Sequence, residues 1–256
     1  MKAERENKMV LKILGSSSKG NCYVLTNGKH CLVIESGVKF REVERAIDYK
    51  ISTLDGVIVS HNHKDHSKYA KEFIENMKPV YCSHGTAVSL GINTYRQCIQ
   101  MQSGTLYKIG NEETAEFSVM PFDIEHDAPE PFGFLIYHKD CGNVLFLTDT
   151  YYSQYTFADV ENIIVECNHD KELLKASHLG MNLQERIAHT HLSLATCKEL
   201  LQANDLTNVR NIVLIHLSIL NSDSELFKTE IEKSTNKKVT IADKGVEIDF
   251  SRGISE

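Results

Sequence analysis

The sequence predicts an α/β fold in which two β-sheets pack against each other between outer layers of helices, a four-layer αββα sandwich. Short apolar runs typical of strands occur along the whole chain, and segments with helical periodicity lie between many of them. Because each apolar face must be buried against another layer, strand-rich blocks joined to helical segments predict stacked sheets covered by helices. At 256 residues the chain can form one large domain, and we expect a single domain over residues 1–256.

Strand signals dominate the first part of the chain. A Ser/Gly loop separates the first two predicted strands, and Asn27-Gly28 predicts a hairpin turn into the third. Val43, Ala46 and Ile47 share one face of a predicted helix. The predicted strands are 10–14, 22–26, 30–35, 56–60, 80–82, 105–109, 116–121, 133–137 and 143–148, and the predicted helices are 40–50, 69–76 and a helix that starts within 85–90.

The C-terminal part mixes strands with longer helical segments. The run 163–167 and the run 211–216 are apolar enough for buried strands. Helices are predicted at 171–177, 192–203 and 224–234, followed by closing strands at 239–242 and 246–250.

Composition excludes several classes of protein. With 41% hydrophobic and 25% charged residues, the chain is neither disordered, collagen-like nor a coiled coil. No apolar run reaches the roughly 18 residues that a membrane span needs, and the polar start, residues 1–9, does not resemble a signal peptide. We therefore expect a cytoplasmic protein with no membrane partner.

The cysteines and the net charge limit the chemistry further. The 7 cysteines form no Cys-x-x-Cys pair, which predicts reduced, mostly buried thiols rather than disulfides or a zinc ribbon. A net charge of −7 disfavours general nucleic-acid binding, because phosphate affinity comes from Lys and Arg. It does not exclude a local basic groove or a site whose bound metals reverse the sign of the field.

The strongest local signal is the run His61-Asn-His-Lys-Asp-His66, which follows the predicted strand 56–60 directly. On an extended or looped backbone His61 and His63 point to the same side and can chelate one cation. Asp65 and His66, on the turn that follows, can reach a second cation. Imidazole with carboxylate suits zinc, manganese or iron rather than calcium.

Further ligands must come from other segments, since each metal needs three or four partners. Three candidates stand where a buried strand gives way to a loop, a position in which a rigid support carries a reacting group. His126 follows the strand 116–121, Asp149 follows 143–148, and His216 ends the strand 211–216.

The order of an HxHxDH run, a later His, an Asp at a strand end and a final His resembles the metallo-β-lactamase superfamily over nearly the whole chain. Five segments are also similar to its YycJ/WalJ-type branch: the Gly/Ser turn 15–21, His126-Asp-Ala-Pro129 with the following Gly133-Phe134, Glu166-Cys-Asn-His-Asp170, His191-Leu-Ser193 and His216-Leu-Ser218. The resemblance implies the metallo-β-lactamase fold and two divalent metals. One is bound by His61, His63 and His126, the other by Asp65, His66 and His216, and Asp149 bridges them.

The resemblance also implies residues that support the site. Glu35 stands where these proteins usually carry Asp, and its longer side chain leaves open whether the usual hydrogen bond is kept. His191 resembles a histidine that contacts phosphate or donates a proton; the alternative is a structural residue beside the start of a helix, and His189 is a competing candidate. His169 is either a group on the substrate side or a plain loop histidine.

Other candidates are weaker. The backbone NH groups of the loop 16–21, with Ser17 and Asn21, can form an anion site. The alternative is a tight turn between strands. The remaining histidines show no partner pattern, and we expect ordinary surface or capping roles for His30, His84, His138 and His178.

Two metals can supply a nucleophile at neutral pH, because they lower the pKa of bound water to about 7, and they neutralise charge on phosphate oxygens. Asp65 can bind the second metal while it orients the water, and His191 lies beside this set. The resemblance implies a phosphodiesterase, an exonuclease-like enzyme that acts on DNA ends or single strands. Little room remains for the extra domain of the larger RNA-processing relatives.

Two other functions fit the same residues. A hydrolase of a small ester, such as a cyclic nucleotide, lactone or thioester, can use the same metals, whereas β-lactam hydrolysis fits poorly with Asp65 and a bridging Asp149. A redox or oxygen-sensing di-iron module, or a vestigial site, is the non-catalytic alternative, although no flavodoxin partner domain is visible. The oligomeric state is open.

Overall fold

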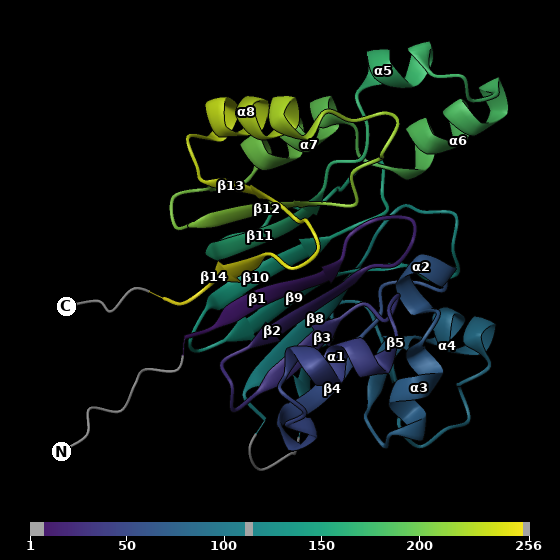
Figure 1. Ribbon diagram of the computed structural model, residues 1–256, viewed down its shortest axis with the longest axis vertical. Helices are drawn as coiled ribbons and strands as arrows, with labels where there is room; N and C mark the ends of the chain where they lie inside the picture. Colours follow the sequence, from purple (N-terminus) through teal and green to yellow (C-terminus); the bar gives the residue numbers. More distant parts are fainter. Residues whose placement is uncertain (1–7, 111–114, 253–256) are drawn as a thin grey trace.

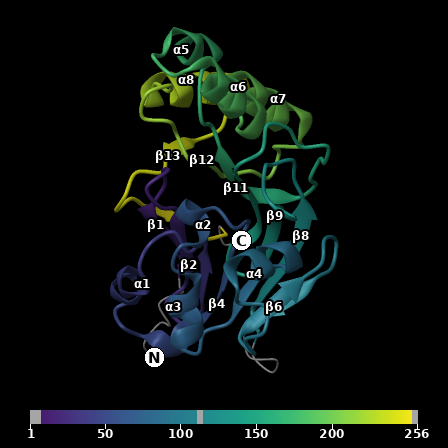
Figure 2. The same ribbon diagram turned by 90° about the vertical axis from the view of Figure 1, so that its right-hand side faces the viewer.

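The computed structural model describes residues 8–110 and 115–252, so most of the polar start, residues 1–7, lies outside the described part. Two seven-stranded sheets face each other, with helices on both outer sides, as Figures 1 and 2 show from two directions. The predicted αββα sandwich is confirmed. The first sheet has the order β14 (Glu247–Asp249), β1 (Val10–Gly15), β2 (Cys22–Thr26), β3 (Cys31–Ile34), β4 (Leu54–Ile58), β5 (Val80–Ser83) and β6 (Cys98–Met101).

The second sheet is built from later strands and carries its own helices. Its order is β13 (Val239–Ile241), β12 (Asn211–Ile215), β11 (Val160–Glu166), β10 (Gly142–Leu147), β9 (Phe132–His138), β8 (Phe117–Asp123) and β7 (Tyr107–Ile109). α7 (Leu194–Ala203) and α8 (Ser224–Thr235) lie on its outer side, whereas α1 (Phe40–Ala46), α3 (Ala70–Glu75) and α4 (His84–Leu90) lie outside the first sheet (Figure 1).

Three clusters of apolar side chains hold the helix and sheet layers of the sandwich together. The largest cluster fills the space between the sheets and includes Tyr23, Phe134 and Phe146, all fully buried. The ring of Phe146 bridges the sheets, with centroid distances of 5.8 Å to Tyr23 and 6.3 Å to Phe134. A second cluster lies between the second sheet and α7 and α8, and a third lies between the first sheet and α1, α3 and α4.

The parallel pairing of neighbouring strands determines at which edge of a sheet their following loops lie close together. β3, β4, β5 and β6 pair in parallel, as do β10, β11, β12 and β13. The carboxyl ends of parallel strands meet at one edge of a sheet, which is where ligands bind in open α/β sheets. The segments after β4, β10, β11 and β12 therefore emerge together.

Several predicted elements differ from the structure. β4 ends at Ile58, so His61 does not follow the strand directly. The predicted helix 40–50 ends at Ala46, because Asp48 and Tyr49 adopt positive φ angles of 53° and 58°. Asp65 and His66 lie in a short helix, α2 (Lys64–Ser67), rather than on a turn.

Three further elements were missed, the four-residue strand β6, the short 3-10 helix Ile51–Thr53 and the polar helix α6 (Met181–Thr190). With α5 (Lys171–Ala176), α6 forms a pair of helices that projects beyond the second sheet in Figure 1. His191 therefore follows the last residue of α6 directly and lies three positions before α7, rather than at the start of a helix.

All 7 cysteines are free, and Cys98 is the one that is not fully buried, in agreement with the expected reduced thiols. None of the helices in the described ranges combines the length and apolar character required to cross a bilayer.

Phe146→Ala is expected to destabilise the protein by about 3–5 kcal/mol, because it removes a ring that contacts both sheets and leaves a cavity. Urea unfolding followed by circular dichroism measures this loss. Tyr95→Ala is the control, since Tyr95 is 48% exposed and should change stability by less than about 0.5 kcal/mol. Equal effects of the two substitutions would contradict the assigned core.

Candidate metal centre

Side chains from four loops converge at the carboxyl edge of the two sheets. His61 and His63 follow β4, His126 follows β8, Asp149 follows β10, and His216 follows β12 directly. Each strand is buried, so the loops that carry these side chains start from fixed points. The structure thus brings together all the residues that the sequence predicts as metal ligands.

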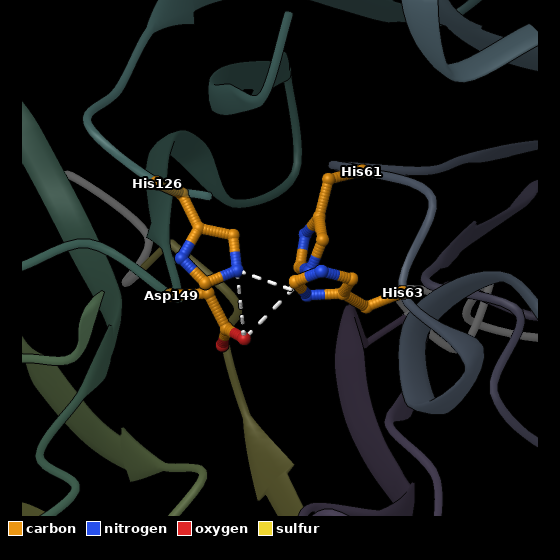
Figure 3. Close-up of side chains that lie close together, drawn as sticks. All are labelled: His61, His63, His126 and Asp149. Carbon is orange, nitrogen blue, oxygen red and sulfur yellow. Dashed lines mark hydrogen bonds and ion pairs between the residues drawn. The ribbon is translucent and has the colours of Figure 1, made fainter. Parts of the chain in front are cut away.

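The first group consists of His61, His63, His126 and Asp149, whose candidate ligand atoms all lie within 4.8 Å of one another (Figure 3). His126 Nε2 is 3.1 Å from His63 Nδ1, and Asp149 Oδ2 is 3.7 Å from Nε2 of both His61 and His126. Three imidazoles and a carboxylate at this spacing match the ligand set of a zinc-type cation.

The second group consists of Asp65, His66 and His216, again with candidate ligand atoms within 4.8 Å. Asp65 Oδ2 lies 3.1 Å from His216 Nε2 and 3.3 Å from His66 Nε2. Asp149 Oδ2 is also 3.3 Å from His66 Nε2, so this carboxylate lies between the two groups. Its position agrees with the bridging role that the resemblance implies.

The protonation of His61 and Asp149 suits a cation. Burial lowers the pKa of His61 well below its usual value, so the ring is neutral, as a ligand must be. Burial raises the pKa of Asp149, but the neighbouring His216 and His66 outweigh this effect and the net pKa is well below the usual value. His61 Nδ1 pairs with Ser60 Oγ at 2.8 Å, and its Nε2 is buried without a hydrogen-bond partner among the described residues. A partnerless buried nitrogen that faces a carboxylate fits a metal ligand.

Glu166, the last residue of β11, is the residue that sequence reasoning missed. Its Oε1 accepts hydrogen bonds from Nδ1 of His191 (2.7 Å) and of His216 (3.0 Å), and its Oε2 accepts from the backbone NH of Leu192 (3.1 Å). Burial raises the pKa of Glu166, but His191 and His216 together outweigh burial, so the net pKa is below its usual value. Glu166 in turn raises the pKa of His191 against the effect of burial. The strand-end argument used for Asp149 and His216 applies equally to Glu166 and could have found it.

Glu35 retains a contact with the site despite its extra methylene. The buried carboxylate accepts from the backbone NH of Ser60, at 3.3 Å and 3.4 Å, and its Oε1 lies 3.6 Å from His66 Nδ1. Burial raises the pKa of Glu35. The longer side chain is therefore accommodated beside His66.

The Ser/Gly loop contributes different atoms from those predicted. Asn21 Nδ2 lies 3.3 Å from Asp65 Oδ2 and 3.1 Å from His66 Nε2, which places Asn21 at the site. Ser17 instead forms a tight turn, in which its Oγ accepts from the backbone NH of Lys19. Ser16 Oγ accepts from the backbone NH of His216 at 3.0 Å.

The remaining histidines differ in burial and in their distance from the candidate metal ligands. His191 lies beside the metal ligands, with its ring stacked on that of His216 at 5.4 Å, whereas His189 is exposed on α6. His169 is buried, and burial lowers its pKa to about 4. The expectation for His138 was wrong, because it is fully buried against Phe117, at a ring distance of 4.6 Å.

The other three histidines of this set are at least partly exposed, as expected. His30 lies 3.3 Å from the carboxylate of Asp55, His84 begins α4 and pairs with Gln100 at 2.7 Å, and His178 is exposed.

Three residues of the centre have left-handed backbone, which is uncommon outside glycine. Their φ angles are 68° for Glu35, 47° for Asp149 and 55° for His216. All three follow strand ends directly or within two residues. Strain of this kind costs about 1–3 kcal/mol per residue and persists where the surroundings fix the backbone, as the paired strands do here.

A cavity of about 390 Å³ opens onto the centre, lined on one side by ligands and on the other by α6. Lys64 and Arg186 supply cationic groups to its wall. Arg186 also forms a two-point ion pair with Asp127, at 2.9 Å from Nε and 2.8 Å from Nη2. Because Asp127 follows His126, this pair connects α6 to the segment that carries a ligand.

Comparison with known proteins agrees with the geometry. The family model of the beta-lactamase superfamily domain matches residues 32–217. The chain is 27% identical to the exodeoxyribonuclease WalJ of Streptococcus pneumoniae, over 93% of this chain and 91% of that protein. Among solved structures it is similar in fold to YhfI of Bacillus subtilis (TM-score 0.66, 17% identity, 94% and 99% of the two chains). Zn²⁺-bound PqqB of Methylobacterium extorquens is comparable (TM-score 0.68, 15% identity, 94% and 100%).

Replacing His61 and His63 together by alanine is expected to remove tightly bound metal, because the first group loses two of its four candidate ligands. Inductively coupled plasma mass spectrometry after dialysis against zinc-containing and metal-free buffer gives the metal content per chain. His189→Ala removes an exposed histidine and should leave the content unchanged. Full metal content in the double variant would refute the assigned ligands.

Gly37→Ala is expected to disturb the second group, because a Cβ at Gly37 would overlap the backbone oxygen of Asp65. The overlap should cost about 1–3 kcal/mol of stability and weaken metal binding. Gly180→Ala is the matched control, since a Cβ there meets nothing within 4 Å. Thermal unfolding and zinc titration report both effects, and a Gly37 variant indistinguishable from the control would show that the contact does not constrain Asp65.

Proposed function

The chain belongs to the beta-lactamase superfamily and is a metal-dependent hydrolase, and we propose that it hydrolyses phosphodiester bonds in DNA as an exonuclease. The similarity to an exodeoxyribonuclease over nearly the full length of both chains supports the choice of DNA. The observation that carries the proposal is His191, held by Glu166 at the wall of the cavity and beside the complete ligand set.

The ligand groups define where the cations would be held. His61, His63, His126 and Asp149 would hold one, Asp65, His66 and His216 would hold a second, and Asp149 would contact both. Divalent metals such as zinc or manganese, with iron as a further option, supply electrostatic stabilisation of a phosphoryl group and a water nucleophile at neutral pH.

The side chains around the cavity supply the rest of the chemistry. Because His191 Nδ1 is committed to Glu166, its Nε2 is the atom available to donate to a phosphate oxygen or to protonate the leaving oxygen. The carboxylate of Glu166 favours the protonated ring that such a donor needs. Asp65 has a carboxylate oxygen between His66 and His216, so it can orient the attacking water toward the phosphorus.

The charge around the cavity suits an anionic substrate in spite of the net charge of −7. Lys64 and Arg186 line the cavity, and Lys19 lies on the same Ser/Gly loop as Ser18, which also lines it. Local cations of this kind can contact the phosphates of a nucleic-acid strand while the rest of the surface remains acidic.

A small-ester hydrolase is the second candidate, and the size of the cavity favours it. A volume of about 390 Å³ lies at the lower end of the roughly 300–1,000 Å³ typical of small-molecule sites. A cyclic nucleotide, a lactone or a thioester would fit this candidate. A vestigial site is disfavoured, because every candidate ligand predicted from the sequence lies within one of the two groups.

Asp65→Ala is expected to lower metal-dependent hydrolysis of end-labelled single- and double-stranded DNA by about 100-fold or more, since displacement of reacting groups by about 1 Å costs that much. The assay is run with manganese and with zinc, with unchanged circular dichroism as the check on folding. Release of mononucleotides by the wild-type protein supports the exonuclease.

Turnover of bis-p-nitrophenyl phosphate with DNA untouched would favour the small-ester candidate. Equal activity of the wild-type and Asp65→Ala proteins would refute the proposed mechanism.

A further inference from the structure

A second cavity lies on the far side of His191 and has no part in the mechanism described above. Its volume is about 420 Å³, and His191 is a wall that it shares with the metal-centre cavity. Its walls are mainly apolar, from Tyr151, Leu174 and Ala188, with polar groups from His169 and Gln184. Lys171, Lys175 and Glu185 also line it.

Helix α6 lies between the two cavities and lines both of them with different faces. Leu183 and Ile187, four residues apart and therefore on one face, line the metal-centre cavity. Gln184 and Ala188, one position further along, line the second cavity. A ligand whose two parts occupy both cavities would therefore pass beside α6 and His191.

His169 is the unusual group in this cavity. Its side chain is 1% exposed, yet its Nδ1 is buried with no hydrogen-bond partner among the described residues. Its backbone is fixed, because its carbonyl oxygen accepts from the NH of Leu194 at 2.8 Å. A buried polar atom without a partner costs about 1–3 kcal/mol unless a ligand or water satisfies it.

We propose that this second cavity binds the nucleobase of the nucleotide whose phosphate lies at the metal centre. The inference rests on the proposed phosphodiesterase function and adds a site for the base. The ring of Tyr151, 43% exposed, offers a flat surface for stacking, and bases stack readily on aromatic side chains. The neutral imidazole of His169 has one donor and one acceptor for the edge of a base.

The remaining polar groups agree with this assignment. Gln184 Nε2 donates to the backbone oxygen of Leu179 at 2.9 Å, which leaves its Oε1 as an acceptor for an exocyclic amino group. Lys171 forms no ion pair among the described residues and can meet a neighbouring phosphate, whereas Lys175 is paired with Glu172. Since each base offers a flat face, stacking would accept all four bases with modest preference.

Binding of deoxyadenosine 5′-monophosphate and of 2-deoxyribose 5-phosphate to the zinc-loaded protein tests the inference, with isothermal titration calorimetry as the measurement. The nucleotide is expected to bind about tenfold more tightly than the sugar phosphate, as stacking of one base typically provides. Ala188→Trp, which fills the cavity from an exposed helix position, and Tyr151→Leu, which removes the stacking ring, should each abolish this preference. Asn182→Trp places the same bulk on α6 away from the lining residues and should retain it.

Equal affinity of the wild-type protein for the two ligands would overturn the inference, as would a preference that survives both Ala188→Trp and Tyr151→Leu. A kinetic comparison separates this result from failure of the proposed function. Thymidine 5′-p-nitrophenyl phosphate should have a KM about tenfold below that of methyl p-nitrophenyl phosphate, which has no ring in place of the nucleoside, and Ala188→Trp should remove the difference. Hydrolysis without a base preference would reject the nucleobase site alone, whereas nucleotide binding without hydrolysis of any diester would reject the phosphodiesterase.

Discussion

The buried carboxylate of Asp149 is the constraint on which the centre depends. An ionised carboxylate in a protein interior is costly unless cationic or hydrogen-bonding groups surround it. Asp149 is 2% exposed, and histidines from three other loops lie within 3.7 Å of its oxygens. These loops follow strands of both sheets, so correct packing of the two sheets is a condition for placing the carboxylate among its partners. The apolar layer between the sheets and the charged group at their edge therefore depend on each other.

Two further buried carboxylates lie against the rings around Asp149, and one of them, Glu166, holds its rings by hydrogen bonds. Glu166 binds the Nδ1 atoms of His191 and His216, and Glu35 lies beside the Nδ1 of His66, so in each case the Nε2 atom is directed toward the centre. Partners of this kind determine which nitrogen of a histidine is available as a ligand or donor. The left-handed backbone at Glu35, Asp149 and His216 brings the chain around sharply at the strand ends. The centre thus combines strained backbone with paired buried charges, an arrangement that the neighbouring strands can support.

The sequence allowed the fold and all seven metal-ligand candidates to be predicted, and the reasons are local. Ligand residues at alternating positions are visible in the run 61–66, and apolar strands that end at His or Asp are visible without knowledge of their neighbours. Glu166 was missed because a glutamate at a strand end resembles an ordinary surface residue until its two histidine partners are known. His138 was misjudged for a similar reason, since its burial depends on packing against Phe117. Helix α6 was overlooked because its apolar positions are few, and it covers a cavity rather than a sheet.

Helix α6 connects the proposed nucleobase cavity with the metal-centre cavity, because it lines both of them. Arg186 joins it to Asp127, next to the ligand His126, and its last residue, Thr190, precedes His191 directly. A shift of α6 would therefore move a wall of both cavities, the ion pair beside one metal ligand and the candidate proton donor together. A hydrolase that must select a nucleotide gains from this coupling, because binding energy from a remote part of the substrate can improve the orientation of the reacting groups. On this basis a substrate that fills both cavities would orient the reacting groups better than one that fills only the metal-centre cavity.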